Sequence, residues 1–363
     1  AALPVRVVGV TGSLGKTTTK EFAAALLATR YAVLKSAGNF NNRLGLSLSA
    51  LKLEEGHEVA VLEMGMSAPG EIRALAAVAP PDVAVITNVA PVHLEFLKTL
   101  EAVAEAKAEI LEGMKAGGTA VLNGDDPRLR EKAGRAPGRV IRFGFSVGCE
   151  VRASGLESLG YDGWRFDLVF GGRKRAVRVP FLSAGFVSDL LAALGAAAAF
   201  GLPWESLEKT LARLEPPAGR GRVLRLGRGI VLIDESYNSS PVALDGALRS
   251  YVRLPAGRRV AFLGDMLELG EGAEAFHREA GGRAVREGWD VLAAVGPLAE
   301  KLLAGAREAG LPAARTAAFP SSAEAASSAA GLVRPGDLVL VKGSRGVRME
   351  TIVVRLEKAF KEK

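Results

Sequence analysis

The sequence predicts an α/β protein with two domains, each built around a mostly parallel sheet. The chain has 363 residues, which is more than one hydrophobic core usually accommodates. Apolar, β-branched runs alternate with helical patterns in both halves, as in doubly wound sheets. A cluster of proline and glycine at residues 215–222 interrupts this alternation and is typical of a linker. We therefore expect domains at residues 1–215 and 216–363.

The first alternation begins with a β-branched strand at residues 5–11, which leads into a glycine-rich loop and a helix at residues 16–29. Further strands are predicted at residues 58–63, 82–87 and 119–123, and further helices at about residues 71–78 and 100–114. These strands are apolar throughout instead of alternating, which indicates a parallel sheet covered on both faces.

The pattern changes between residues 139 and 180, where short β-rich segments predict a small subsheet. Gly171 and Gly172 separate two of these segments and predict a hairpin turn. Two helices, at about residues 187–200 and 204–214, are expected to complete the first domain.

The second alternation follows the linker and predicts a Rossmann-like α/β domain. Its predicted strands are residues 229–234, 259–264, 290–295 and 337–342, and its predicted helices are about residues 242–251, 274–287, 298–309, 322–333 and 349–359. Ligands of such domains bind where the parallel strands end. Residues that follow the strands are therefore the first candidates for function.

Composition narrows the possible functions. The formal net charge is +7, but the basic residues are scattered without interleaved aromatic residues, so we do not expect nucleic-acid binding. Cys149 is the only cysteine, which excludes an intrachain disulfide and a cysteine-built zinc site. The sequence has neither a signal-like start nor an apolar run of 18 residues. We expect a cytoplasmic monomer that is not embedded in a membrane.

Residues 8–20, VGVTGSLGKTTTK, predict a phosphate-binding loop. Gly12 and Gly15 let backbone N–H groups face phosphate oxygens, and Lys16 adds a cation. A strict Walker A box has glycine at position 10, where this chain has Val10, and the alternative is a plain strand-to-helix turn. The predicted nucleotide contacts of the loop are Gly12, Ser13, Leu14, Gly15, Lys16, Thr17 and Thr18. With this loop, the first domain resembles the phosphate-loop ATPases.

Two polar residues lie at or after the ends of successive predicted strands of the first domain. Glu63 ends its strand, where a carboxylate can complete a Mg²⁺ shell beside Thr17; the alternative is a solvated strand-end charge. His93 follows the next strand, where it is either a metal or phosphate ligand or a structural histidine.

Lys107 lies on the apolar stripe of the helix at residues 100–114, at i+4 from Val103 and i−3 from Ile110. Either its amine snorkels to solvent, or burial lowers its pKa. A neutral amine could react with CO₂ to give a carbamate that binds Mg²⁺. Lys107 is therefore a candidate catalytic residue.

A glycine-bounded stretch at residues 38–45, GNFNNRLG, carries three asparagines. Their amides suit the polar edges of a ligand, and the alternative is an asparagine-rich turn. The predicted substrate contacts of this stretch are Asn39, Asn41 and Asn42.

Eight segments resemble the motifs of the Mur ligase family, in the order that the family has them. They are TGSLGKT at residues 11–17, GNFNNRLG at 38–45, EMGMSAPGEI at 63–72, ITNVAPVHLE at 86–95, AKAEI at 106–110, DESYN at 234–238, LGDMLELG at 263–270 and KGSR at 342–345. The resemblance covers nearly the whole chain. It is greatest with members that join D-alanyl-D-alanine to a UDP-N-acetylmuramoyl-tripeptide.

The resemblance implies an ATP-dependent ligase of cytoplasmic peptidoglycan precursor synthesis, which forms an amide through an acyl phosphate. Such chemistry depends on positioning and charge neutralisation by two Mg²⁺ ions. Lys16 is implied to contact the β- and γ-phosphates, and Thr17 and Glu63 to hold the first Mg²⁺. His93 and carbamoylated Lys107 are implied to hold the second.

The remaining roles also follow from the resemblance. The asparagine stretch would face the UDP-muramoyl peptide. The nucleotide would meet Arg220, Asp234, Tyr237 and Asn238, and the dipeptide carboxylate would meet Lys342, Ser344 and Arg345. The alternatives are a related amide ligase, of the folylpolyglutamate, cyanophycin or polyglutamate synthetase type, and an inactive nucleotide-binding module.

The sequence departs from the family at three places. The uridine-binding domain that opens the family has no counterpart before the phosphate loop. Glu235 and Ser240 stand where the family pattern has aspartate and asparagine. The family's G-x-H-N stretch is replaced at residues 185–189, so its histidine contact is not expected here.

Overall fold

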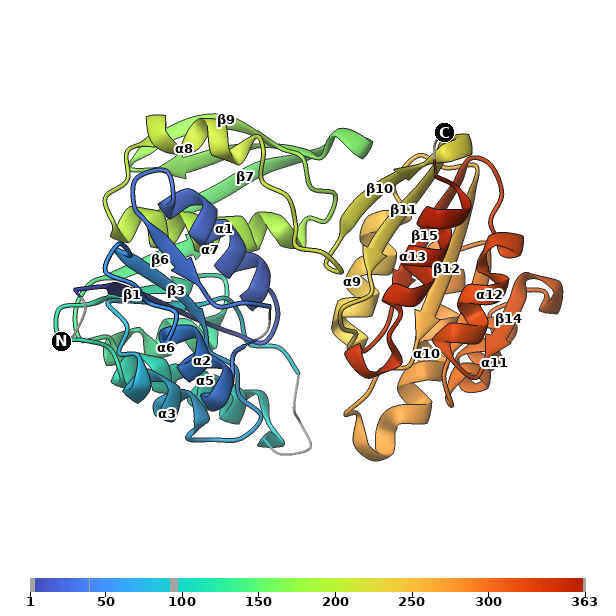
Figure 1. Ribbon diagram of the computed structural model, residues 1–363, viewed down its shortest axis with the longest axis horizontal. Helices are drawn as coiled ribbons and strands as arrows, with labels where there is room; N and C mark the ends of the chain where they lie inside the picture. The colour runs from blue at the N-terminus through green and yellow to red at the C-terminus, as the bar shows by residue number, and fades with distance from the viewer. Residues whose placement is uncertain (1–3, 39, 92–96, 362–363) are drawn as a thin grey trace. The chain divides into compact units, whose positions relative to one another are not determined.

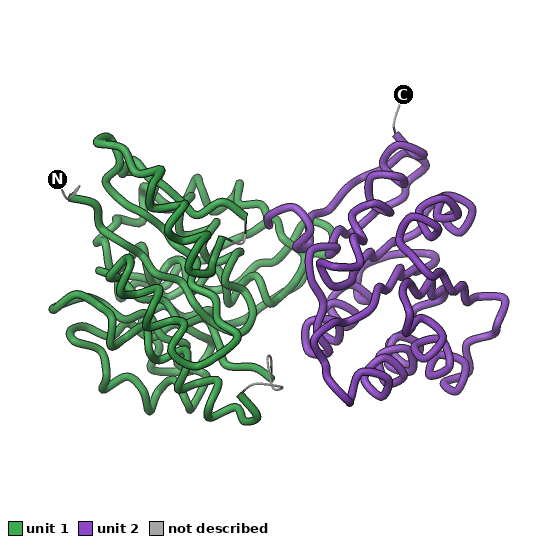
Figure 2. The backbone as a smooth tube through the Cα atoms, turned by 60° about the horizontal axis from the view of Figure 1, so that its bottom comes forward, with its two compact units in different colours: residues 1–215 green, residues 216–363 purple. Residues whose placement is uncertain are grey.

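The structure is a computed structural model that describes residues 4–38, 40–91 and 97–361 (Figure 1). The chain divides into two compact units, Ala1–Glu215 (unit 1) and Pro216–Lys363 (unit 2), which Figure 2 colours separately. Each unit has its own sheet. No helix in the described ranges has the length and apolar character needed to cross a bilayer.

Unit 1 contains a sheet whose described strands follow the order β2-β3-β1-β4-β5-β6-β7-β8-β9. The bounds are β1 (Arg6–Thr11), β2 (Val33–Lys35), β3 (Val59–Glu63), β4 (Val83–Ile86), β5 (Thr119–Asn123), β6 (Val140–Gly144), β7 (Val151–Ser158), β8 (Trp164–Phe170) and β9 (Arg173–Val179). The sheet is parallel from β2 to β7 and antiparallel from there to β9. The β-rich segments therefore extend the main sheet, because β7 pairs with β6 through Phe143–Val151 and Gly144–Arg152.

Helices cover both faces of this sheet, as the apolar strands predict. The bounds are α1 (Lys16–Leu27), α2 (Arg43–Ala50), α3 (Glu71–Val78), α5 (Leu100–Glu112), α6 (Pro127–Lys132), α7 (Gly185–Ala199) and α8 (Trp204–Leu211). Residues of α1, α7 and α8 share one core cluster, and residues of α2, α3, α5 and α6 share the other. A Cβ on Gly195 of α7 would lie 2.4 Å from Val121, so this helix packs closely on β5.

The Gly171-Gly172 prediction is confirmed. Both residues have positive φ, 58° and 72°, and they join β8 to β9 in a two-residue turn. Such a turn needs left-handed backbone at both positions, which glycine adopts without strain.

Unit 2 contains a described sheet in the order β10-β11-β15-β12-β13-β14, in which only β10 is antiparallel to its neighbour. The strands are β10 (Arg222–Leu226), β11 (Ile230–Glu235), β12 (Arg258–Gly264), β13 (Val291–Val295), β14 (Thr316–Phe319) and β15 (Asp337–Lys342). The helices are α9 (Pro241–Tyr251), α10 (Ala273–Glu287), α11 (Ala299–Glu308), α12 (Ser322–Leu332) and α13 (Glu350–Ala359). Apolar residues of α12 and α13 form one core with the sheet, and α10 contacts α9 and α11.

Candidate active site at the phosphate loop

The phosphate loop, residues 11–17, joins β1 to α1 at the carboxyl edge of the unit 1 sheet. Gly12 and Gly15 have φ of 147° and 79°, in the region that favours glycine. A Cβ on Gly12 would lie 1.8 Å from Thr87 Oγ1, and a Cβ on Gly15 would lie 1.9 Å from Asp189 Oδ1. The loop therefore requires glycine at both positions, because a side chain at either would collide with Thr87 or Asp189.

The end of β4 holds this loop in place. Leu14 N donates to Asn88 Oδ1 at 2.9 Å, and the Leu14 carbonyl accepts from Thr87 Oγ1 at 2.6 Å. Ser13 N donates to the Asn88 carbonyl at 3.0 Å. Thr87 and Asn88 were not among the predicted site residues. The only available signal was their position at the end of the strand predicted at residues 82–87, where Thr87 is the last residue and Asn88 follows it.

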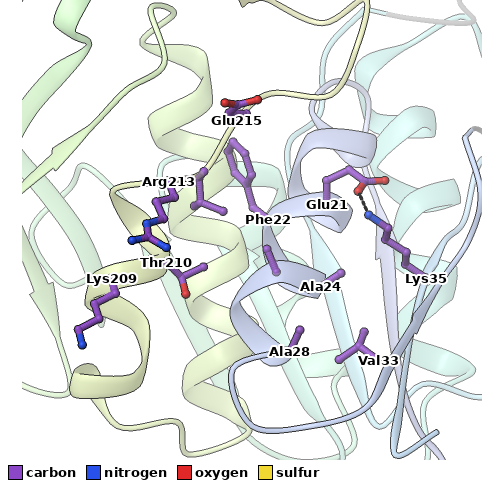
Figure 3. A pocket seen from close by; sticks show the side chains of 12 residues that line it. Glu21, Phe22, Ala24, Ala28, Val33, Lys35, Lys209, Thr210, Arg213 and Glu215 are labelled. Carbon is purple, nitrogen blue, oxygen red and sulfur yellow. Dashed lines mark hydrogen bonds and ion pairs between the residues drawn. The ribbon is translucent and has the colours of Figure 1, made fainter.

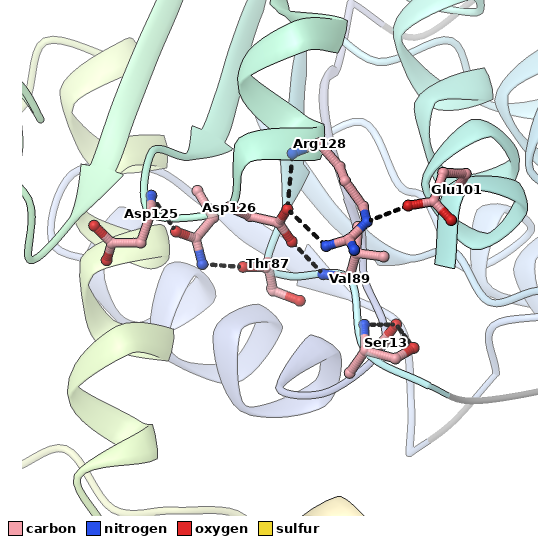
Figure 4. A network of polar contacts seen from close by, with 9 residues as sticks. Ser13, Thr87, Val89, Glu101, Asp125, Asp126 and Arg128 are labelled. Carbon is pink, nitrogen blue, oxygen red and sulfur yellow. Dashed lines mark hydrogen bonds and ion pairs between the residues drawn. The ribbon is translucent and has the colours of Figure 1, made fainter. Parts of the chain in front are cut away.

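A second group of residues supports the end of β4 (Figure 4). Asn123 Nδ2 donates to the Thr87 carbonyl at 2.9 Å, and Asp126 accepts from Val89 N at 3.1 Å. Asp126 also accepts from Arg128 N at 3.0 Å and so caps α6. The backbone that carries the loop contacts is therefore fixed from β5 and α6.

Lys16 is the first residue of α1, and its side chain turns back to contact the loop. It donates to the Gly12 carbonyl at 2.8 Å and to the Ser13 carbonyl at 3.1 Å. Backbone N–H groups at a helix N-terminus and a lysine above them form an anion site. This arrangement fits the triphosphate of a nucleotide.

Thr17, Glu63 and Asn41 meet beside the loop. Thr17 Oγ1 donates to Glu63 Oε2 at 2.7 Å, and Asn41 Nδ2 donates to Glu63 Oε1 at 2.8 Å. Glu63 is buried, so the alternative that it is a solvated charge at the strand end is wrong. A hydroxyl and a carboxylate are ligands suited to Mg²⁺, which completes its shell with waters and phosphates. Within the described ranges, no group of three or more His, Cys, Asp or Glu side chains is placed to hold a metal ion.

Lys107 of α5 is buried, with 2% of its surface exposed. Burial, and then the charge of Lys16, lower the pKa of the Lys107 amine well below its ordinary value. The snorkelling alternative is therefore wrong, and the prediction of a desolvated amine is confirmed. His93 and Asn39 lie outside the described residues.

The stretch around Asn42 is a helix start as well as a turn. Asn42 Oδ1 accepts from Gly45 N at 2.8 Å and caps α2, a helix that the sequence analysis did not predict. Asn41 contacts Glu63, as described above. The two described asparagines are thus bonded within unit 1 in this structure.

In unit 2, the predicted nucleotide residues gather where β11 ends. Asp234 accepts from Gly219 N at 3.1 Å and from Ser236 N at 3.1 Å. The Tyr237 ring lies 4.1 Å from the Arg220 guanidinium and 5.6 Å from that of Arg345. Two guanidinium groups therefore lie within cation–π distance of one aromatic ring.

Lys342 and Ser344 are bonded to the loop that follows β11. Lys342 Nζ donates to Glu235 Oε2 at 3.1 Å and to the Asn238 carbonyl at 3.0 Å, and it is buried. Ser344 Oγ donates to the Ser239 carbonyl at 3.3 Å. Both side chains therefore support this loop, and their contact with the dipeptide carboxylate stays a prediction. Arg345 is 63% exposed and pairs with Glu350 at 3.2 Å.

The two departures in the same segment have structural explanations. Glu235 also accepts from Tyr251 Oη at 2.7 Å, so its carboxylate joins β11 to α9 and β15. Ser240 Oγ accepts from Ala243 N at 3.3 Å and caps α9. Both side chains therefore organise the segment.

The chain is similar to known ligases over nearly its whole length. The Mur ligase middle domain matches residues 10–197, and the Mur ligase glutamate ligase domain matches residues 219–345. The UDP-N-acetylmuramoyl-tripeptide--D-alanyl-D-alanine ligase of Bacillus subtilis is 36% identical over 352 residues, which are 97% of this chain and 76% of that protein. The protein of the same name from Escherichia coli is 30% identical over 98% of this chain and 77% of its own length.

Solved structures give the same result. MurF ligase from Thermotoga maritima in complex with ADP has a TM-score of 0.85 and 34% identity, over 98% of this chain and 80% of that chain. MurF from Acinetobacter baumannii has a TM-score of 0.89 and 30% identity, over 98% of this chain and 77% of that chain. Since one family domain spans more than half of the sequence and relatives of at least 30% identity extend over nearly all of it, the chain belongs to the Mur ligase family.

Proposed function

We propose that this protein is an ATP-dependent ligase that joins D-alanyl-D-alanine to a UDP-N-acetylmuramoyl-tripeptide, in cytoplasmic peptidoglycan precursor synthesis. The observation that carries the proposal is the phosphate loop with the buried Thr17–Glu63 pair beside it, in a chain whose relatives have this activity in their names. Loop and pair together can bind a metal-bound triphosphate.

The reaction consists of two displacements. The terminal carboxylate of the tripeptide attacks the γ-phosphorus of ATP, and the bond to the bridging oxygen breaks, which releases ADP and leaves an acyl phosphate. The dipeptide amine then attacks the carbonyl carbon. Phosphate leaves with the electrons of the broken C–O bond, the amine nitrogen loses a proton, and an amide remains. Backbone N–H groups of the loop and Lys16 stabilise the negative charge during the first step.

Thr17 and Glu63 would hold the first Mg²⁺, and the hydrogen bond from Asn41 fixes the orientation of the Glu63 carboxylate. A bound Mg²⁺ neutralises phosphate charge. The second ion would be held by His93 and a carbamate on Lys107. The neutral Lys107 amine attacks CO₂, a C–N bond forms, and one proton is released. Burial supports this role, because it disfavours the ammonium form that cannot react.

In unit 2, we assign Arg220, Asp234, Tyr237 and Asn238 to the nucleotide and Arg345 to the dipeptide carboxylate. A guanidinium can pair with a carboxylate through two hydrogen bonds. Lys342 and Ser344 would assist by holding the loop that carries Asn238.

An assay of phosphate release tests the proposal. ATP and UDP-N-acetylmuramoyl-tripeptide are supplied with D-alanyl-D-alanine, L-glutamate or L-aspartate. We expect turnover with D-alanyl-D-alanine only. Equal turnover with an L-amino acid would identify a related amide ligase, and no turnover at high substrate would identify a nucleotide-binding module. The monomeric state and the cytoplasmic location stay predictions, which light scattering and cell fractionation would test.

A further inference from the structure

Lys20 is a fully buried cation that the proposed reaction does not use. It lies in α1, one turn after Lys16 and Thr17, and its side chain has 0% exposure. Its ammonium contacts the Ser36 carbonyl at 2.7 Å, the Gly38 carbonyl at 2.9 Å and Glu21 Oε1 at 3.1 Å. An ammonium group has three donors, and here each has an acceptor. The burial of this charge is therefore compensated by specific contacts.

The two carbonyls belong to the start of a segment that leads to the candidate metal site, of which the structure describes residues 36–38 and 40–42. At one end of this segment, Ser36 Oγ accepts from Glu63 N at 3.1 Å. At the other end, the Asn41 carbonyl accepts from Gly65 N at 2.8 Å, and Asn41 Nδ2 donates to Glu63 Oε1. The segment thus lies along the end of β3, and Lys20 joins it to α1.

The contacts of α1 form two parallel links to the same region. Thr17 reaches the Glu63 carboxylate directly, and Lys20, three residues later, reaches the backbone of residues 36–38. Residues three and four apart lie on one face of a helix. One face of α1 therefore contacts both the carboxylate and the segment whose asparagine orients it.

We propose that Lys20 is a positioning residue that holds this segment, through residues 36–38, against the phosphate-loop helix. Lys20 thereby couples the nucleotide site to the site for the UDP-linked substrate. The inference rests on the proposed function for the identity of that substrate. The placement of the segment itself is independent of it. Loss of the ammonium releases residues 36–38 and moves Asn41 away from Glu63, while the phosphate loop keeps its form because the end of β4 holds it.

Lys35 provides a matched control. It forms an ion pair with Glu21, but it is 50% exposed, and its ammonium makes no hydrogen bond to the described residues 36–38 and 40–42. Substitution of Lys35 by methionine removes the ammonium that pairs with Glu21 but leaves the contacts of Lys20 with the segment in place. Both Glu21 and Lys35 line a pocket of about 460 Å³ in unit 1 (Figure 3).

Two measurements on Lys20→Met, Lys20→Gln and Lys35→Met test the proposal. Hydrogen–deuterium exchange of the unliganded protein should be about tenfold faster at Phe40 and Gly65 in Lys20→Met, with α1 still protected. Steady-state kinetics should show a KM for UDP-N-acetylmuramoyl-tripeptide raised about tenfold or more, and a KM for ATP within about twofold of the original. Lys20→Gln keeps N–H donors and should change both quantities less, and Lys35→Met should change neither.

Unchanged exchange in both Lys20 variants would overturn the proposal. A parallel rise of both KM values, or a loss of activity that follows the unfolded fraction, would show that Lys20 only stabilises unit 1. If Lys20→Met does not fold, Lys20→Gln gives the deciding exchange rates. If the original protein has no ligase activity, the proposed function fails, and exchange alone then decides the positioning role.

Discussion

Both units place charged side chains at the carboxyl edge of their parallel strands, but these side chains have different partners in the two units. In unit 1, Glu63 ends β3 and Thr17 lies in the first turn of α1. Their side chains form a hydrogen bond beside the glycine-containing phosphate loop. In unit 2, Glu235 and Lys342 end the neighbouring strands β11 and β15, and their charges hold a partner helix and a loop. A charged residue at the end of a strand therefore indicates a ligand-binding site only where its hydrogen-bond partners leave room for a ligand beside it.

Lys107 gives the largest expected effect on the unit 1 side of this comparison. Lys107→Ala should lower ligase activity by roughly 10²–10³-fold, as removal of a group that stabilises transition-state charge does. Acetate should restore part of the activity, because it can occupy the space and supply the carboxylate. Initial rates with and without acetate and bicarbonate measure this. Full activity of the variant would dismiss the carbamate.

Lys107→Met separates catalysis from folding. Methionine replaces a buried amine with a side chain of similar length and no charge, so the free energy of unfolding should not fall. Urea denaturation of the variant and the original measures it. A variant that is inactive and as stable as the original supports a functional lysine; a strongly destabilised one contradicts it.

Glu63→Gln should have the next largest effect. Its amide oxygen can still accept from Thr17, but the charge that attracts Mg²⁺ is lost. We expect activity to fall by roughly 10²-fold and to recover partly at high Mg²⁺. Titration of activity with Mg²⁺ measures this, with the exposed Glu55→Gln as control. An unchanged Mg²⁺ dependence would remove Glu63 from the metal site.

Lys342→Met should act on stability, in contrast to these unit 1 variants. Removal of Lys342 leaves the part-buried carboxylate of Glu235 without its cation, which should cost about 1–3 kcal/mol, less than in a fully buried pair. The double variant with Glu235→Gln should recover part of that loss. Urea denaturation and ligase kinetics measure both. A normal stability with a raised KM for the dipeptide would instead place Lys342 at the dipeptide carboxylate, as the sequence analysis expected.

The sequence predicted the fold well where the local pattern was strong. The predicted bounds of α3 (Glu71–Val78) and β15 (Asp337–Lys342) agree with the structure, because each is a continuous helical or apolar pattern. Helix α2 was missed, since it is short and its cap, Asn42, belongs to a stretch typical of turns. Strand β10 was missed because it begins at the end of the predicted linker.

The candidate site was predictable where a residue conflicted with its own helix or strand. Lys107 was visible as a charge on an apolar stripe, and its burial is confirmed. Lys20 gave no such signal, because it follows three threonines and its acceptors come from residues 36–38. Asn88 and Asp126 act through contacts between different strands and helices. Such partners follow from sheet order, which a single sequence does not specify.

The smallest expected effect concerns Tyr251 of unit 2. Burial, and then the charge and hydrogen bond of Glu235, raise the pKa of the Tyr251 hydroxyl well above its ordinary value of 10.0. Below pH 10.0 the hydroxyl is protonated in both the folded and unfolded states, so it gives no pH dependence. Above that pH the unfolded state loses this proton and the folded state keeps it, so stability should fall as pH rises. Tyr251→Phe should lower stability at neutral pH by about 1 kcal/mol, through the lost hydrogen bond, and should flatten the alkaline decline. Urea denaturation from pH 8 to pH 11 measures both, and an equally steep decline in the variant would assign the alkaline loss to other groups.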